Sequence, residues 1–201
     1  MTTIWNLAHD EQVFTSNVFL TVADTDEGRT VLVDPGNGFD VVPKVREKLD
    51  GGTLDAVVLT HTHSDHVGNV GSVVEAFDCD VWGYDPEHEL VDHAIADGET
   101  VLLGDHEFLA VHTPGHKDDH LCLYSEDGGV LFAGDLVFAN GSFGRTDLEE
   151  GDRDTLVDSI DRLLDIVAPS LSEMHTGHGP SITTNPRHDI ETASRAAQMM
   201  G

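Results

Sequence analysis

The sequence predicts an α/β (α+β) fold in which mixed β-sheets are covered by helices, in a single domain spanning residues 1–201. Three observations predict it. The chain has 201 residues, which is the size of one domain and enough to bury a substantial core. No internal repeat or Pro/Gly-rich linker divides it. Short apolar runs separated by turn residues alternate with segments of helical spacing.

The first elements expected are a hairpin, a helix and a buried strand. Apolar runs at residues 18–23 and 30–34 flank a turn rich in Asp and Gly, which is typical of a hairpin. Residues 40–49 have helical spacing. The nearly continuous apolar run at residues 54–60 indicates a strand that is buried on both faces.

A polar loop, a short helix and another strand are expected next. Residues 71–77 have the composition of a short helix, and residues 81–84 that of a strand. Asp85 and Pro86 then provide an N-cap and a first-turn proline, so we expect a helix to begin there.

The second half is expected to contain more strands and two longer helices. Strands are expected at residues 101–103, 107–112, 120–124, 129–133 and 171–175. Apolar residues at helical spacing form one stripe along residues 152–167, which predicts a helix with one buried face. Asn185 and Pro186 begin a last helix that runs towards Met200.

The chain is strongly acidic, with 38 Asp plus Glu against 10 Lys plus Arg and a formal net charge of −28. Nucleic acids and anionic membranes are therefore disfavoured as partners, because both bind through clustered basic side chains. Acidity spread along the chain predicts a halophilic protein, with an ordinary acidic protein as the alternative. At molar salt the screening length is about 3 Å, so charge alone does not exclude nucleic acid.

The two cysteines and the N-terminal segment indicate where in the cell the protein is expected to reside. Cys79 and Cys122 lie far apart in apolar segments, which indicates buried thiols and not a disulfide or a cysteine metal site. The N-terminal residues lack the apolar core of a secretory signal, and no apolar run has the length of a membrane span. We therefore expect a soluble, cytoplasmic protein.

A dense group of metal-ligand side chains follows the buried strand at residues 54–60. His61, His63, Asp65 and His66 lie within six residues of one another. Loops at the carboxyl ends of buried strands are where α/β folds build their sites. His61 and His63 point the same way if strand geometry continues, so both can hold one metal ion. Asp65 and His66 then turn towards a neighbouring position.

This motif resembles the signature of the metallo-β-lactamase superfamily, and the resemblance extends over about residues 14–185. Three further segments carry it, namely Thr113-Pro114-Gly115-His116, Ala133-Gly134-Asp135 and Gly177-His178-Gly179-Pro180. The resemblance implies a four-layer αββα sandwich, in which two mixed sheets are flanked by helices.

The resemblance also implies a site for two divalent metal ions. Its ligands would be His61, His63 and His116 for the first ion, Asp65, His66 and His178 for the second, and Asp135 as the bridge. Asp65 also counts as a catalytic residue. A set of nitrogen and oxygen donors suits Zn²⁺, which is the expected metal, and also Fe or Mn²⁺.

Two bridged metals indicate a hydrolase of a small-molecule substrate, because they lower the pKa of a shared water and supply hydroxide. A thioester is favoured, since a thiolate, whose acid has a pKa of about 8.5, leaves without a general acid. Residues 138–147 also resemble a loop of small glyoxalase II-like hydrolases. There Arg145 either pairs with a substrate carboxylate or forms a salt bridge with a neighbouring Asp.

Other functions remain open. Residues 138–147 also resemble the corresponding loop of persulfide dioxygenases. If the protein is of that kind, the resemblance implies that His61, His116 and Asp135 hold a single iron. A nuclease or phosphodiesterase of the superfamily is another alternative, whereas a non-enzymatic binding protein fits poorly because no ligand position is missing. The sequence ends 23 residues after His178, without a match to the glutathione-holding helical domain of full-length glyoxalase II, so the thiol carrier is open.

The remaining histidines and one aspartate carry weaker signals. His112 and His120 flank the His116 loop, and each either orients a ligand or packs. Asp34, in Val33-Asp34-Pro35-Gly36, matches a recurrent segment of the superfamily, and we expect it to support the site without binding metal. Six histidines are interpreted as surface or packing residues: His9, His88, His93, His106, His175 and His188.

Overall fold

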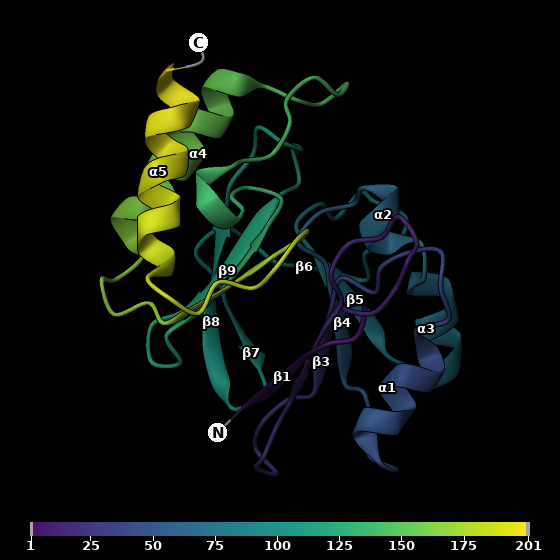
Figure 1. Cartoon of the computed structure of the whole chain (residues 1–201). Coiled ribbons are helices and arrows are strands. Elements are labelled where there is room, and N and C mark those ends of the chain that lie inside the picture. Colours follow the sequence, from purple (N-terminus) through teal and green to yellow (C-terminus); the bar gives the residue numbers. More distant parts are fainter. Residues whose placement is uncertain (1, 200–201) are drawn as a thin grey trace. The chain divides into compact units, whose positions relative to one another are not determined.

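The computed structural model describes residues 2–199, which form two compact units. Unit 1 comprises the residues up to Ile95 together with Val101–Glu107. Unit 2 comprises Ala96–Thr100 and the residues from Phe108 onward. The chain carries two mixed sheets with helices beside them, as predicted (Figure 1). That residues 1–201 form one domain stays a prediction.

The first sheet has six strands in the order β1-β2-β3-β4-β5-β6. Their bounds are β1 Thr3–Asn6, β2 Phe19–Val22, β3 Val31–Val33, β4 Ala56–Val58, β5 Asp80–Gly83 and β6 His93–Ala94. Strands β1, β2 and β3 pair antiparallel, which confirms the predicted hairpin. Strands β3 to β6 pair parallel. The central strands β3 and β4 are buried along their whole length, as parallel strands usually are.

Three helices belong to unit 1: α1 (Val42–Leu49), α2 (Ser64–Val67) and α3 (Val70–Phe77). Val45 of α1 and Val73 of α3 are fully buried and lie in one apolar cluster with Leu32 of β3 and Val57 of β4. Helices α1 and α3 therefore bury their apolar sides against the sheet. The short helix α2 falls in the segment where the sequence predicts a polar loop.

The prediction of a helix beginning at Asp85 and Pro86 is wrong, because this segment forms turns. The Asp85 side chain accepts a hydrogen bond from the backbone N–H of Glu87 at 2.9 Å, so it caps a turn and not a helix. The chain then returns to β5, where the N–H of Asp92 donates to the carbonyl of Val81 at 2.9 Å. Only a few residues separate these two anchors, which leaves no room for a helix.

The second sheet has five strands in the order β11-β10-β9-β8-β7. The bounds are β7 Thr100–Leu103, β8 His106–His112, β9 Leu121–Ser125, β10 Val130–Gly134 and β11 Glu173–Thr176. Strand β9 pairs antiparallel with β8 and β10, whereas β10 and β11 are parallel. Two longer helices, α4 (Arg153–Ile166) and α5 (Pro186–Met199), and the 3₁₀ turn η1 (Ala139–Gly141) lie in unit 2. Position 200, where the last helix was expected to end, lies outside the described residues.

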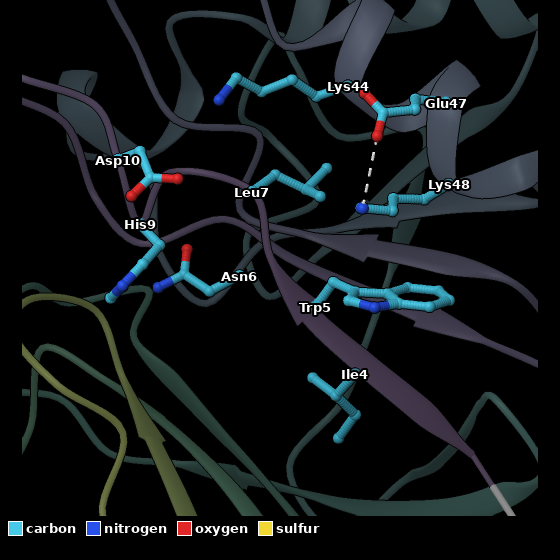
Figure 2. A pocket seen from close by; sticks show the side chains of 9 residues that line it. All are labelled: Ile4, Trp5, Asn6, Leu7, His9, Asp10, Lys44, Glu47 and Lys48. Carbon is cyan, nitrogen blue, oxygen red and sulfur yellow. Dashed lines mark ion pairs between the residues drawn. The ribbon is translucent and has the colours of Figure 1, made fainter.

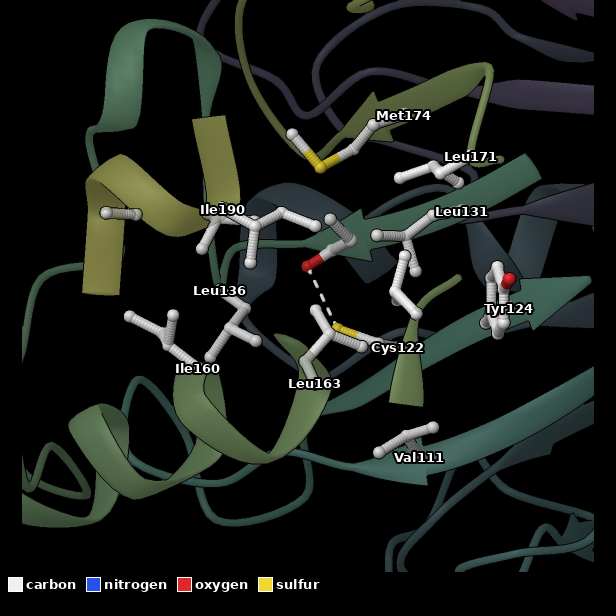
Figure 3. Packing of buried hydrophobic residues seen from close by; sticks show 14 of the residues in the cluster. Val111, Cys122, Tyr124, Leu131, Leu136, Ile160, Leu163, Leu171, Met174 and Ile190 are labelled. Carbon is white, nitrogen blue, oxygen red and sulfur yellow. Dashed lines mark hydrogen bonds between the residues drawn. The ribbon is translucent and has the colours of Figure 1, made fainter. Parts of the chain in front are cut away.

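Helix α4 is the element that the sequence predicts best. Asp152 caps it, because its side chain accepts a hydrogen bond from the N–H of Thr155 at 2.7 Å. Leu156, Ile160 and Leu163 of the predicted stripe are fully buried in the core of unit 2. Figure 3 shows Ile160 and Leu163 among side chains of the sheet and of α5. No helix within residues 2–199 has the length and apolarity needed to cross a bilayer.

Both cysteines are buried and unbridged, as predicted. Cys122 belongs to the core of unit 2, and its thiol lies 3.5 Å from the carbonyl oxygen of Ala133 (Figure 3). Burial raises the pKa of Cys122 to about 12, so this thiol is not a nucleophile at neutral pH.

Candidate metal centre

In unit 1, the end of β4 places four candidate ligands in one short segment. The N–H of Leu59 donates to the carbonyl of Trp82 at 2.8 Å, which continues the pairing with β5 beyond the strand. The chain then turns at His63 into helix α2, which contains Asp65 and His66. We call His61, His63, Asp65 and His66 the unit-1 cluster.

Asp34 supports the unit-1 cluster from the end of β3. Its two carboxylate oxygens accept hydrogen bonds from the N–H of Thr60 at 2.8 Å and from the Thr60 hydroxyl at 2.6 Å. The second oxygen also accepts from His66 Nδ1 at 2.8 Å. Because Nδ1 carries the proton, His66 Nε2 keeps its lone pair for a metal. This geometry agrees with the supporting role predicted for Asp34.

The same network sets the orientation of His61. The Thr60 hydroxyl gives its hydrogen to Asp34, so its oxygen accepts from His61 Nδ1 at 3.1 Å. His61 Nε2 therefore carries a lone pair, and it lies 3.0 Å from His63 Nδ1. The ring centres of His61 and His66 are 4.0 Å apart. In addition, ligand atoms of Asp65 and His66 lie within 4.8 Å of each other.

In unit 2, a tight packing contact places His116. The preceding residue, Gly115, has a φ of 122°, and a Cβ there would lie inside the backbone of Leu156 in α4. The carbonyl of Gly115 accepts a hydrogen bond from the N–H of Asp152 at 2.8 Å. Helix α4 therefore holds the His116 loop in place, and only glycine fits at position 115. His116 itself is buried.

Asp135 lies where β10 leaves the sheet. The pairing of β10 with β11 shifts register between Phe132 and Gly134, which is the sign of a β-bulge. Gly134 has a φ of 48°, and its carbonyl accepts from the N–H of Gly177 at 2.7 Å. Because Gly177 precedes His178, this hydrogen bond fixes the Asp135 and His178 segments relative to each other.

The three candidate ligands of unit 2, His116, Asp135 and His178, meet at one carboxylate oxygen. We call them the unit-2 cluster. Asp135 Oδ2 lies 3.4 Å from His116 Nε2 and 3.5 Å from His178 Nε2. His116 Nδ1 donates to the backbone carbonyl of Arg145 at 2.8 Å, so its Nε2 carries a lone pair.

The chemistry of these donors fits a bound cation. The lone pair of His116 Nε2 faces a carboxylate oxygen at 3.4 Å, and two such acceptors repel unless a proton or cation is shared between them. A tetrahedral ion with bonds of about 2.1 Å holds its ligand atoms about 3.4 Å apart. Three pairs, His61–His63, His116–Asp135 and His178–Asp135, have ligand atoms 3.0 to 3.5 Å apart, close to that spacing. Each cluster thus presents nitrogen and oxygen donors with suitable orientation.

The structure brings the seven predicted ligands together as two groups, one within each unit. Arg145 belongs to unit 2, and its guanidinium forms two hydrogen bonds with Asp147, at 2.7 and 2.8 Å. This matches the salt-bridge alternative in the sequence analysis. The hydrogen bonds from Arg145 lower the pKa of Asp147, and both side chains are exposed. A role for Arg145 in substrate binding stays a prediction.

The other histidines mostly follow their interpretation. The five histidines His9, His88, His93, His106 and His188 are exposed or half-buried, as surface residues are. His112 Nε2 lies 2.7 Å from the carbonyl oxygen of Asp118, so this ring supports the loop around His116. His175 is buried, as a packing residue: its Nδ1 lies 2.9 Å from the Ser181 hydroxyl, and its ring packs on Phe132.

We expect His175 to make unit 2 sensitive to acid. Burial lowers the pKa of His175 to about 4, from an ordinary value of 6.5. As the pH falls, His175 is therefore protonated in the unfolded chain before it is protonated in the folded chain. The stability that is present above pH 6.5 is lost as the pH falls towards 4. The loss amounts to about 3 kcal/mol.

Unfolding free energies measured from pH 7 to pH 4 check this expectation. His175→Asn, which cannot be protonated but keeps a polar group near Ser181, should lose less stability over this range than the wild type. The exposed His188→Asn is the matched control and should follow the wild type. Parallel profiles for the wild type and His175→Asn would contradict the expectation.

Unit 1 also contains a pocket of about 470 Å³ that shares no lining residue with the unit-1 cluster (Figure 2). Its lining residues are Ile4, Trp5, Asn6, Leu7, His9, Asp10, Lys44, Glu47 and Lys48. Lys44 Nζ lies 2.7 Å from Glu11 and Lys48 Nζ lies 3.5 Å from Glu47. Because each lysine faces a carboxylate, the pocket does not concentrate positive charge.

Residues 12–178 match the family model described as the metallo-beta-lactamase superfamily. The chain belongs to this superfamily. The match includes all seven candidate ligands and Arg145. It confirms the resemblance seen in the sequence.

Three individual proteins illustrate the relationship. An uncharacterized protein of Aquifex aeolicus is 37% identical over 164 residues, which cover 71% of this chain and 75% of the relative. A hydroxyacylglutathione hydrolase of Marinomonas sp. is 37% identical over 131 residues, covering 64% of this chain and 49% of that protein. The chain thus spans about half the length of that hydrolase. The crystal structure of TTHA1623 in a di-iron-bound form has 32% identity and a TM-score of 0.72, over 90% of this chain and 94% of that one.

Proposed function

We propose that this protein is a metal-dependent hydrolase whose two clusters together hold two divalent metal ions. Three imidazoles would hold the first ion, two imidazoles and a carboxylate would hold the second, and one further carboxylate would be shared by both. In that order, the ligands are His61, His63 and His116, then Asp65, His66 and His178, and finally Asp135.

One observation carries this proposal: in three of the five candidate histidine ligands, His61, His66 and His116, the Nδ1 atom is held by an oxygen acceptor, which leaves Nε2 to bind a metal. His66 Nδ1 is held by Asp34, and His116 Nδ1 by the carbonyl of Arg145. His61 Nδ1 is held by the Thr60 hydroxyl, which Asp34 holds in turn. Such partners fix the tautomer and the ring direction of metal-binding histidines. A surface histidine that only fills space has no need of them.

Bound metal ions at such a site lower the pKa of water and polarise the carbonyl group under attack. The carboxylates of the chain hold and orient the candidate histidine ligands. Asp135 places one negative charge between His116 and His178, which would offset part of the charge of bound cations. Asp34 places a second carboxylate behind His66 and raises the basicity of its ring.

The substrate class proposed is a thioester of a hydroxyacyl group. A thiolate leaves without a proton donor, since its conjugate acid has a pKa of about 8.5, whereas an amide nitrogen or a sugar oxygen leaves far less readily. The name of the Marinomonas relative, hydroxyacylglutathione hydrolase, supports the same class. Because the chain spans about half of that relative, glutathione itself is one carrier among several to be tested.

Thiol release from S-lactoyl thioesters of different thiols tests the proposal. We expect metal-loaded protein to release thiol from at least one of them, to lose turnover after dialysis against a chelator, and to regain it with Zn²⁺, Mn²⁺ or Fe²⁺. Oxygen uptake with a persulfide and one iron per chain would instead favour a persulfide dioxygenase. Cleavage of labelled single-stranded DNA or RNA, without thioester turnover, would favour a nuclease. Either result would contradict the proposed function.

A further inference from the structure

His120, a neighbour of the His116 loop, lies at the centre of a buried series of hydrogen bonds in unit 2. Its side chain is fully buried. Its Nε2 accepts a hydrogen bond from the backbone N–H of Asp135 at 2.9 Å, and its Nδ1 lies 2.8 Å from the Thr113 hydroxyl. The Thr113 hydroxyl lies 3.4 Å from the sulfur of Cys122. This series of hydrogen bonds therefore runs from the edge of the unit-2 cluster into the core.

The direction of each hydrogen bond in this series follows from which of its groups can donate. A backbone N–H can only donate, so His120 Nε2 accepts from Asp135 and the ring proton resides on Nδ1. Nδ1–H then donates to the Thr113 oxygen, and the Thr113 hydroxyl donates to Cys122. His120 is thus held as one tautomer by the Asp135 N–H, which follows β10, and by the Thr113 hydroxyl on the loop after β8.

The partner of His120 is the backbone N–H of Asp135, which lies beyond the regular pairing of β10. The β-bulge ends the regular pairing of β10 just before Asp135. A buried N–H at this point needs an acceptor, because leaving it unpaired is costly. His120 provides that acceptor and so fixes the peptide plane from which the Asp135 side chain projects towards His116 and His178.

We propose that His120 is a positioning residue that holds the backbone of Asp135 and thereby directs its carboxylate between the two imidazoles of the unit-2 cluster. The consequence for metal binding rests on the proposed function. The effect on the backbone of Asp135 does not, and it can be measured on protein without metal. His120 touches neither the substrate nor a metal in this proposal.

Two conservative variants separate positioning from packing. His120→Gln keeps a side-chain oxygen near the position of Nε2, so it can still accept from the Asp135 N–H. His120→Asn keeps a donor near the position of Nδ1 for Thr113 but ends short of Asp135. Both lose the imidazole ring, so a role in packing alone predicts similar behaviour of the two variants.

The first readout is hydrogen exchange at the Asp135 amide, measured in the full chain after metal removal. Exchange should be close to that of the wild type in His120→Gln and about tenfold faster in His120→Asn. Equal exchange in the wild type and His120→Asn would overturn the proposal. So would equal acceleration in both variants, since the hydrogen bond would then not decide the effect.

The second readout is metal affinity, measured by competition with a chelating dye. His120→Asn should bind the metal 10–100-fold more weakly than His120→Gln. Leu163→Ala in α4 is the control for lost stability, because it opens the core of unit 2 and removes neither a hydrogen-bond partner of His120 nor a candidate ligand. It should lower the melting temperature and keep the affinity. If the wild type binds no metal, the proposed function fails, and the exchange rates still decide the role of His120.

Discussion

Asp135→Ala is expected to abolish hydrolysis and to remove at least one metal ion per chain. Its Oδ2 is the atom that His116 and His178 both face, at 3.4 and 3.5 Å, so its loss affects both proposed metal positions. Replacing a partner that only supports a ligand costs about 10–100-fold, and a bridging ligand should cost more. Turnover and metal content, measured on the same preparation, check this expectation.

Two further variants make the Asp135 result interpretable. Asp127→Ala removes an exposed carboxylate in the turn between β9 and β10 and should leave turnover and metal content unchanged. Asp135→Asn keeps the shape but not the charge, and should weaken binding less than Asp135→Ala. The metal-free melting temperature of Asp135→Ala should remain close to that of metal-free wild type, because Asp135 lies at a strand end outside the apolar core. Turnover within a few-fold of the wild type would remove Asp135 from the site.

Gly144→Ala is expected to disrupt the unit-2 cluster although no functional group is removed. A Cβ at position 144 would overlap the backbone carbonyl oxygen of Asp135 and lie 3.1 Å from the Cβ of His116. A backbone oxygen cannot rotate away as a flexible side chain can, so one of the two ligand segments must move. Overpacking of this kind costs about 1–3 kcal/mol, and displaced ligands should lower metal affinity by more than about tenfold.

Gly71→Ala is the matched control for Gly144→Ala. Gly71 lies within helix α3, where an added Cβ meets no atom within 4 Å. Alanine there should be neutral or stabilise unit 1 by up to about 1 kcal/mol, because glycine is a poor residue inside a helix. Thermal unfolding and metal titration of both variants provide the comparison. Unchanged metal affinity in Gly144→Ala would show that this close approach does not constrain the ligands.

Much of the fold is predictable because apolar periodicity and turn residues agree along most of the chain. Helix α4 shows this best, since Asp152 caps it and its apolar stripe is buried as expected. The helix expected after Asp85 fails because the same N-cap chemistry also starts a turn, and the pairing of Asp92 with β5 decides between them. Strand β1 (Thr3–Asn6) is missed because its four residues show no clear alternation.

The candidate ligands are predictable because their spacing and turn glycines leave a signal in the sequence. The groups that orient them leave much less. Thr60 supports His61 through its hydroxyl, and Gly144 matters through the space that it leaves beside Asp135. The sequence marks His120 only as a neighbour of the His116 loop, and its contacts are needed to show that its ring accepts from the N–H of Asp135. Such roles depend on hydrogen-bond direction and close packing, which one sequence does not encode locally.

Metal content per chain is the most direct test of the proposed centre. Protein purified without chelators, or loaded with Zn²⁺ and freed of excess metal, would be analysed by native mass spectrometry and by elemental analysis. We expect two metal ions per chain in the wild type, and fewer after substitution of any of the seven assigned ligands. A wild-type chain that binds no metal, or binds it unchanged after His63→Ala and His178→Ala together, would contradict the metal centre on which the proposed function depends.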